Sequence, residues 1–387
     1  MTSRAAGTAV LLVVTVAAAV ALEAGDRSGG APEYLVWPPY MKQKSVPAPG
    51  VMIGIGGPAR FETNALGIRG PDLLPSRRKE YRILFIGGSS TECFYLDQEK
   101  AWPAIVGARL GATADGRSVW AGNAGRSGHN SRDHLLEMRL MIPRLDVDAV
   151  VVTMGVNDLG LRLAQDAAFN PDFLATEANV TYQEGHAFSV HPEDPNLAFY
   201  RKGRLGRILG LDPDAQRRKP YQVVDGAGLI FLKWREYRRL GPKAETLPDL
   251  TAALGEYVRN VAGIAAIAAK ERLRVIFLTQ PALWRAGLTD AESGVLWLGG
   301  IGDFQEKAGA TYYTAEALAR GLEAYNRTLM ESCAKAGAEC LDLAPAIGRD
   351  LSVFYDDCHL NEPGARSMAE GVAAYLSARP PFARTKP

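Results

Sequence analysis

The sequence of 387 residues has few of the residues that mark disulfide scaffolds, metal centres or nucleic-acid-binding proteins. It contains only four cysteines and five histidines, and the cysteine spacing fits no zinc-binding pattern. Charge is nearly balanced, with 44 Lys and Arg against 43 Asp and Glu, so nothing global indicates a nucleic-acid partner. A Walker phosphate loop and a Rossmann glycine fingerprint are both absent. We therefore expect a protein that uses no cofactor.

The histidines offer no recognisable metal site. His129 and His134 lie around the start of a predicted helix, and His186 and His191 lie in a long insertion. Neither pair has the i, i+4 spacing with a third ligand nearby that a metal site needs. We predict that no metal is bound.

The N-terminal segment contains a long run without charge. Residues 5–22 follow Arg4 and are themselves followed by Glu23 and Asp26. This layout is typical of a secretory signal peptide or a short membrane anchor, and a buried core helix is the bland alternative. For residues 1–26 the cleaved and the anchored forms both stay open. Either form places the rest of the chain outside the cytoplasm, periplasmic or secreted, or held at the inner membrane.

The organisation of the chain changes at residue 81. Residues 27–80 are rich in Gly and Pro, and we expect an irregular N-terminal extension there. Beyond it, short apolar runs alternate with helical periodicity, which predicts an α/β fold around a buried parallel sheet. The expected strands cover 82–88, 118–125, 148–155, 274–281 and 339–345. The expected helices cover 102–112, 133–145, 250–268, 314–337 and 362–377.

Two insertions interrupt this alternation, at about 160–246 and 284–312. Within the first, residues 200–245 hold twelve Lys and Arg against five Asp and Glu, with aromatic residues between them. Such a stretch is either a solvated lobe or a surface that faces anionic lipid or an acidic glycan.

Polar side chains follow the strands where a parallel sheet gathers its reactive groups, at the carboxyl ends. The segments are GGSST (87–91), NAGRSGHNS (123–131), GVND (155–158) and DDCHL (356–360). A serine needs a base to become a nucleophile, and histidine is the usual one. Among the five histidines, only His359 has a carboxylate, Asp356, three residues upstream in a loop beyond the sheet. That spacing lets Asp356 orient the imidazole, and Asp357 is the less favoured orienter.

In this order, the four segments resemble those of the SGNH hydrolase superfamily, the GDSL-type esterases and lipases, over roughly 81–160 and 250–377. The resemblance implies a flavodoxin-like three-layer α/β/α sandwich with a central five-stranded parallel sheet, in a hydrolase domain covering 81–380. It also implies that Ser89 is the nucleophile, with Asp356 and His359 completing the catalytic set. One position departs from the family pattern, because Gly88 stands where the family carries aspartate. The resemblance is therefore to a divergent branch of the family, and the family's substrates transfer to this chain less readily.

The resemblance further implies an oxyanion hole. The donors would be the backbone N–H groups of Ser89 and Gly128 and the side-chain amide of Asn157. Asn157 could instead merely cap the turn that follows it, and Asp158 is expected to be structural.

These features predict a serine ester hydrolase that acts on an O-acyl ester of a glycan or lipid through an acyl-serine intermediate. An extracytoplasmic O-acyltransferase that modifies a polysaccharide is the alternative within enzymes. A catalytically silent binding module attached to the membrane is the alternative outside them. The expected partners are the acylated glycan or lipid and a membrane surface, without nucleic acid.

The cysteines have two candidate pairings in an oxidising compartment. Cys333 and Cys340 flank a short helix-to-strand turn. Cys93 and Cys358 come into one neighbourhood if Ser89 and His359 share a site, so both pairs are disulfide candidates.

Overall fold

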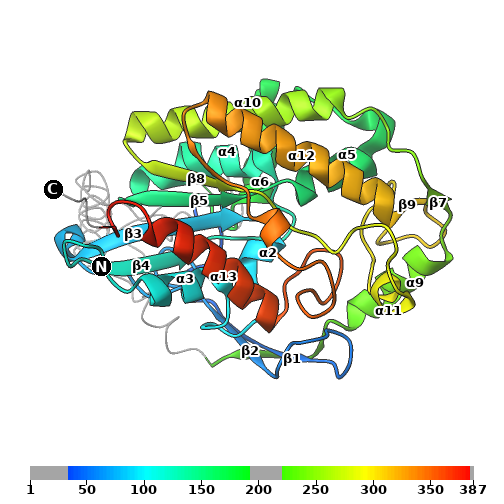
Figure 1. Ribbon diagram of the computed structural model, residues 1–387, viewed down its shortest axis with the longest axis horizontal. Coiled ribbons are helices and arrows are strands. Elements are labelled where there is room, and N and C mark those ends of the chain that lie inside the picture. Colours follow the sequence, from blue (N-terminus) through cyan, green and yellow to red (C-terminus); the bar gives the residue numbers. More distant parts are fainter. Residues whose placement is uncertain (1–33, 192–219, 384–387) are drawn as a thin grey trace, which may run out of the picture.

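The computed structural model describes residues 34–191 and 220–383. At its centre is a five-stranded parallel sheet in the order β10-β8-β5-β3-β4 (Figure 1). Its strands are β3 (Glu80–Gly87), β4 (Ser118–Asn123), β5 (Ala149–Thr153), β8 (Arg274–Leu278) and β10 (Glu339–Leu341). Every residue of β3 and β5 is buried, because helices cover both faces of the sheet. The predicted fold class and the five parallel strands are confirmed.

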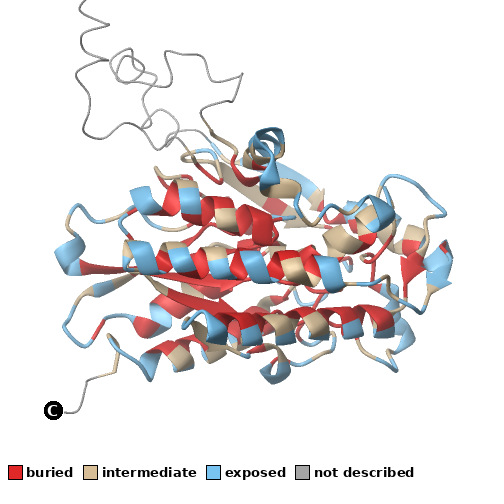
Figure 2. Cartoon of the chain, turned by 90° about the horizontal axis from the view of Figure 1, so that it is seen from above, coloured by how far each residue is buried: buried red, intermediate tan, exposed pale blue. Residues whose placement is uncertain are grey.

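The helices form two layers around the sheet (Figure 1). One layer contains α4 (Ser131–Leu136), α5 (Val156–Gln165), α10 (Thr251–Glu271) and α12 (Ala315–Lys335). The other contains α3 (Trp102–Leu110) and α13 (Glu362–Ser377), which pack on each other. Figure 2 shows buried and exposed residues alternating along the helices at helical spacing, as expected of amphipathic helices that face a sheet. Thr314 caps α12, because its side chain accepts from the backbone N–H of Ala317.

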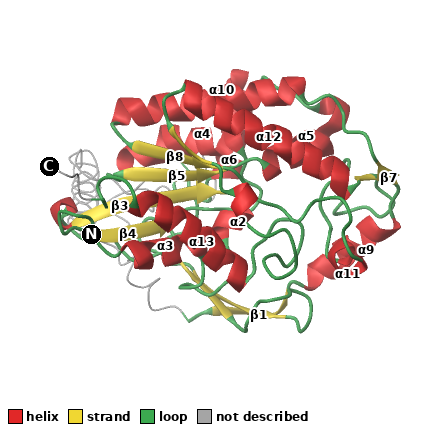
Figure 3. Cartoon of the chain, viewed as in Figure 1, coloured by secondary structure: helices red, strands yellow, loops and turns green. Residues whose placement is uncertain are grey.

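A second, smaller sheet includes the strand labelled β1 in Figure 3, and it joins segments far apart in the sequence. Its order is β2-β1-β6, with β1 (Lys42–Pro47), β2 (Ala59–Glu62) and β6 (Gln222–Ala227). The N-terminal extension, expected to be irregular, therefore contributes two strands, and its β1 pairs with β6 of the long insertion. A two-stranded pair of β7 (Lys243–Ala244) and β9 (Tyr312–Tyr313) likewise joins the ends of the two insertions.

The remaining elements are short. The α-helices are α2 (Ser89–Glu92), α6 (Glu177–Ala187), α9 (Leu229–Leu240) and α11 (Asp290–Gly294). Single helical turns are η1 (Arg77–Lys79), η3 (Ile142–Arg144), η4 (Asp166–Ala168), η5 (Phe173–Ala175) and η7 (Ala344–Ala346), and η2 (Glu137–Met141) is a π-helix. The helix expected over 133–145 is thus a chain of three helical types.

The N-terminal run at 5–22 and much of the basic stretch lie outside the described residues. Within 34–191 and 220–383, no helix is both long and apolar enough to cross a membrane.

One of the two cysteine pairings is present. Cys333 and Cys340 are joined by a disulfide, with their Cα atoms 6.1 Å apart, between the end of α12 and β10. Cys93 and Cys358 are both buried and free, so a bond between them is not part of this structure. The Sγ of Cys93 points back along its own turn and donates to the Ser90 carbonyl at 3.3 Å. Proximity of the two segments to one site is therefore not enough to pair their thiols.

Candidate active site

Ser89 is placed by the turn between β3 and α2. Strand β3 ends at Gly87, Gly88 is the N-cap, and Ser89 is the first residue of α2. A side chain at position 88 would collide with the amide nitrogen of Asn157. In this chain the Asn157 amide therefore occupies the space beside Gly88, which gives a physical reason for the glycine at this position.

The structure brings Ser89, His359 and Asp356 together in a line of hydrogen bonds. The Nε2 atom of His359 lies 2.7 Å from Ser89 Oγ. The Nδ1 atom of the same ring lies 2.9 and 2.8 Å from the two carboxylate oxygens of Asp356. Such an arrangement can remove the serine proton as the hydroxyl attacks an electrophile.

Asp356 is fully buried and held by several donors. Its oxygens accept from the backbone N–H groups of Cys358 and His359 at 3.1 and 3.0 Å, and from Trp297 Nε1 at 3.0 Å. Burial alone would raise the pKa of Asp356, but the His359 charge and these bonds hold it below its ordinary value. The carboxylate therefore stays ionised and keeps the proton of His359 on Nδ1.

The interaction between His359 and Asp356 raises the pKa of His359 while it lowers that of Asp356. Burial lowers the pKa of His359, yet the charge and hydrogen bond of Asp356 outweigh it, and the net pKa lies above the ordinary 6.5. Its ring lies nearly parallel to those of Trp297 and Tyr355, at interplanar angles of 8° and 11°. These neighbours restrict the ring to the plane that faces Ser89.

The three predicted oxyanion donors border one space. Gly128 and Asn157 line the same cavity as Ser89. Gly128 has a φ of +83°, a backbone conformation that favours glycine. One amide hydrogen of Asn157 is donated to the His129 carbonyl at 2.7 Å, which fixes the side chain and leaves the second hydrogen for the cavity. The backbone N–H of Ser89 lies in the first turn of α2, where helices leave donors without partners.

The cavity above these groups has a volume of about 500 Å³. Its lining includes Glu92, Ser127, Gly128 and Asn157 together with Ser89. Its walls are mostly aromatic. They comprise Phe94, Tyr95, Phe231, Trp234, Trp297 and Tyr355. The two insertions supply part of this wall, through α9 and through the segment around Trp297.

A family model places the chain among known proteins. The GDSL-like Lipase/Acylhydrolase family model matches residues 85–366, which covers the sheet from the end of β3 onward and all four polar segments. The chain belongs to the GDSL-like lipase/acylhydrolase family. This membership makes it a carboxylic ester hydrolase of the esterase type. The catalytic roles of the individual residues stay predictions.

Solved structures resemble this GDSL-like hydrolase only distantly. An acetylxylan esterase from Geobacillus stearothermophilus aligns at 13% identity and a TM-score of 0.43, over 79% of this chain and 97% of its own. An alpha/beta hydrolase from the metagenome of Lake Arreo, Spain, aligns at 15% identity and a TM-score of 0.40, over 76% and 94%. Such values say nothing about the substrate. No curated relative matches the sequence.

Asp357 has a different task from Asp356 in this GDSL-like hydrolase. Its Oδ1 accepts from Trp284 Nε1 at 2.8 Å, and its Oδ2 accepts from the backbone N–H groups of Trp297 and Leu298 at 2.7 and 3.1 Å. Asp357 therefore anchors the second insertion and does not contact His359 through these bonds.

Sequence reasoning missed Glu92 and Trp297. Glu92 Oε2 accepts from Ser127 Oγ at 2.5 Å in the cavity lining, and burial raises the pKa of Glu92 to about 7. Its position three residues after Ser89 puts it on the same side of α2, a signal that the sequence does contain. The contact between Trp297 and Asp356 spans 59 residues of sequence, and no local pattern indicates it.

Among the described residues, the histidines His129, His134 and His186 lie close enough to buried carboxylates that together they could hold a metal ion. His129 and His134 both bind the buried carboxylate of Glu137 through Nδ1, at 3.0 and 2.9 Å, and His186 binds Asp133 at 2.8 Å. Sequence reasoning found no third ligand near the histidines, whereas the fold places Glu137 between two of them. These bonds satisfy both carboxylates without an ion, and the expectation of no metal stays a prediction.

We expect ester hydrolysis to fail at acidic pH, because His359 must be neutral to accept the Ser89 proton. Since the pKa of His359 lies above 6.5, the rate should fall as pH drops through a midpoint above that value. Glu92, whose own pKa is about 7, contributes to this elevation to the extent that it is ionised, so Glu92→Gln should move the midpoint modestly to lower pH. Profiles of kcat/KM against pH for both proteins give the two midpoints. A wild-type midpoint below 6.5, or a shift upward in the variant, would contradict the assignment.

Proposed function

We propose that the protein hydrolyses a short O-acyl ester carried by a glycan or lipid, through an acyl-serine intermediate. The observation that carries this proposal is the line of hydrogen bonds Ser89–His359–Asp356, whose first two members line a cavity. The reaction would begin with attack of Ser89 Oγ on the acyl carbon, while His359 Nε2 takes the hydroxyl proton. The carbonyl oxygen would become an oxyanion next to Gly128 and Asn157.

The second half of the reaction uses the same groups. Protonated His359 would give its proton to the departing alcohol oxygen as the ester bond breaks, which leaves the acyl group on Ser89. Water, deprotonated by His359, would then attack this acyl-enzyme, and the carboxylic acid would leave with the Ser89 hydroxyl restored.

The cavity supports a short acyl group more than a long one. Glu92 and Ser127 line the cavity together with Ser89, and burying a carboxylate against an alkyl chain is costly. The aromatic walls, with Trp234 and Trp297 among them, suit the apolar face of a sugar ring as well as a lipid alcohol. We therefore favour a small acyl group on a glycan.

An O-acyltransferase would form the same acyl-serine and differ only in what attacks it. The walls built by both insertions favour this second candidate to a degree, because a cover that limits water access helps a sugar compete with water. Water attacks an acyl-serine unless it is excluded from the site, so we favour hydrolysis over transfer to a sugar. A silent binding module is disfavoured by the hydrogen bond between Ser89 and His359.

The test measures both outcomes at once. The protein is incubated with p-nitrophenyl acetate, with and without about 1–10 mM acetyl-acceptor oligosaccharides, a range that begins at the upper end of ordinary KM values. Free acetate and acetylated sugar are then quantified together. We expect acetate to dominate. Faster acetyl transfer to sugar would establish the transferase, and failure of a fluorophosphonate probe to label Ser89 would overturn both enzymatic proposals.

We also propose an extracytoplasmic location with contact to a membrane surface. The uncharged run at 5–22 and the basic, aromatic-laced stretch at 200–245 support it. Separation of membrane and soluble fractions after expression of the full chain tests this.

A further inference from the structure

Gln280 connects the segment that carries the predicted nucleophile, Ser89, with the segment that carries the predicted oxyanion donor, Asn157. It lies two residues beyond the end of β8, and only 5% of its surface is exposed. Its side-chain Nε2 donates to Ser90 Oγ at 2.9 Å, and its Oε1 accepts from the backbone N–H of Val156 at 3.0 Å. Ser90 is the neighbour of Ser89, and Val156 is the neighbour of Asn157. One amide group thus bonds both helix starts that border the reaction site.

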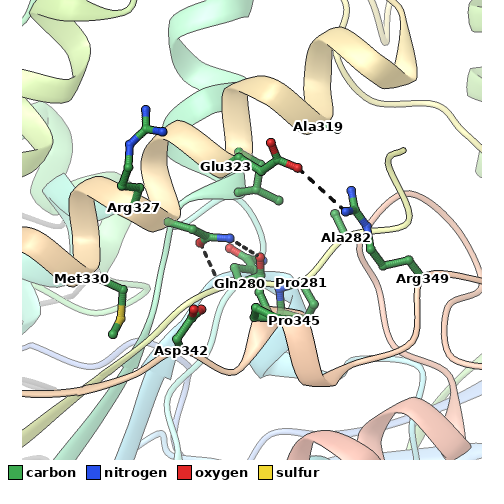
Figure 4. Close-up of a pocket in the computed structure, with 13 residues that line it drawn as sticks. Gln280, Pro281, Ala282, Ala319, Glu323, Arg327, Met330, Asp342, Pro345 and Arg349 are labelled. Atoms are coloured by element: carbon green, nitrogen blue, oxygen red, sulfur yellow. Dashed lines mark hydrogen bonds and ion pairs between the residues drawn. The ribbon is translucent and has the colours of Figure 1, made fainter. Parts of the chain in front are cut away.

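Gln280 is itself held by a second amide. Asn326 of α12 accepts from the Gln280 backbone N–H and donates to the Gln280 backbone carbonyl, each at 3.0 Å. Both backbone groups of Gln280 are therefore held in place, which fixes the position from which its side chain extends. Figure 4 shows Gln280 in the wall of a second cavity of about 420 Å³, with the Glu323–Arg349 ion pair farther out.

The bridge matters because α2 and α5 begin after different strands. Ser89 starts α2 behind β3, and Asn157 lies in the first turn of α5 behind β5. Oxyanion donors act only when they lie close to hydrogen-bond distance from the developing charge. A shift of α5 against α2 by a fraction of an ångström would move Asn157 relative to the carbon that Ser89 attacks.

We propose that Gln280 is a positioning residue that fixes the spacing between Ser89 and Asn157 through Ser90 and Val156. This inference rests on the proposed ester hydrolysis. Gln280 itself would touch neither substrate nor reacting atoms, so its loss should slow the chemical step without weakening substrate binding.

The decisive variant is Gln280→Met, which keeps the length of the side chain and removes both hydrogen-bonding groups. We expect kcat on p-nitrophenyl acetate to fall roughly 10- to 100-fold while KM stays within about threefold. The matched control is Thr279→Val. Thr279 is equally buried, but its hydroxyl bonds Asp342 and the backbone of Leu343 and Ala344, away from Ser89. The Thr279→Val variant should have a lower melting temperature, and its kcat should stay within about threefold of wild type.

A further readout separates positioning from general damage. The ratio of rates on an oxyester and the matching thionoester reports use of the oxyanion donors, because sulfur is a poor hydrogen-bond acceptor. This ratio should fall in Gln280→Met and stay unchanged in Thr279→Val. If Gln280→Met does not fold, the Asn326→Leu variant, which frees the Gln280 backbone, serves in its place. Its ratio of oxyester to thionoester rates should also fall, but by less.

An unchanged ratio, or a kcat within about threefold of wild type in a folded Gln280 variant, would overturn the positioning role. A wild-type protein that neither hydrolyses esters nor labels at Ser89 would refute the proposed function and this inference with it. The two outcomes can be told apart, because failure of the positioning role alone leaves the wild-type protein active on esters.

Discussion

Ser89→Ala should abolish ester turnover, with a loss of roughly a thousandfold or more. Ser90→Ala, which removes only one of the two side-chain hydrogen bonds of Gln280, should keep at least about a tenth. The two hydroxyls lie one residue apart but in different surroundings. Ser89 Oγ lies 2.7 Å from His359 Nε2 and borders the cavity. The Ser90 side chain is buried, and its hydroxyl accepts from Gln280, so no base is positioned to remove its proton.

Two measurements check this expectation. Hydrolysis of p-nitrophenyl acetate gives the rates, and mass spectrometry after fluorophosphonate treatment identifies the modified serine. Wild type and Ser90→Ala should carry the label on Ser89, and Ser89→Ala should carry none. Full activity of Ser89→Ala together with an inactive, folded Ser90→Ala would assign the nucleophile to the other serine.

Asp356→Asn should lower kcat by roughly 10³- to 10⁴-fold, whereas Asp357→Asn should cost mainly stability. The amide at position 356 would present a donor to His359 Nδ1 and stabilise the wrong tautomer, so that Nε2 could no longer take the Ser89 proton. At position 357 an amide keeps one oxygen. It therefore loses the bond to Trp284 or those to the backbone of Trp297 and Leu298.

Rates and thermal melts of the two variants form a matched pair, since each exchanges one buried carboxylate for an amide in the same loop. We expect the melting temperature of Asp357→Asn to fall and its kcat to stay within about tenfold of wild type. Equal losses of kcat in the two folded variants would show that the second insertion, and not the orientation of His359, limits the reaction.

The sequence predicted the parts of the protein that depend on local pattern. The apolar runs at 82–88 and 148–155 correspond closely to β3 and β5, since the central positions of a strand buried on both faces favour apolar residues. The polar segments after the strands met because parallel strands end at one edge of a sheet. The contact of Ser89, His359 and Asp356 follows from that geometry.

Long-range pairing and burial explain what was missed. The strands β1 and β2 lie in a Gly- and Pro-rich stretch, and β1 finds its partner β6 almost 180 residues later. The predicted helix at 133–145 becomes a π-helix at Glu137, where a carboxylate buried between His129 and His134 offers no sequence signal. Gln280 was read only as the end of a strand, because its partners Ser90 and Val156 lie more than 120 residues away.

The small sheet β2-β1-β6 has an evolutionary consequence. Strand β6 runs directly into α9, which carries Phe231 and Trp234 of the cavity wall, and β6 is held at the sheet edge by β1. Changes within 42–62 can therefore tilt this wall without touching Ser89, Asp356 or His359. Selection for a new ester can act on the extension and the insertions, while the residues that break the bond are inherited intact.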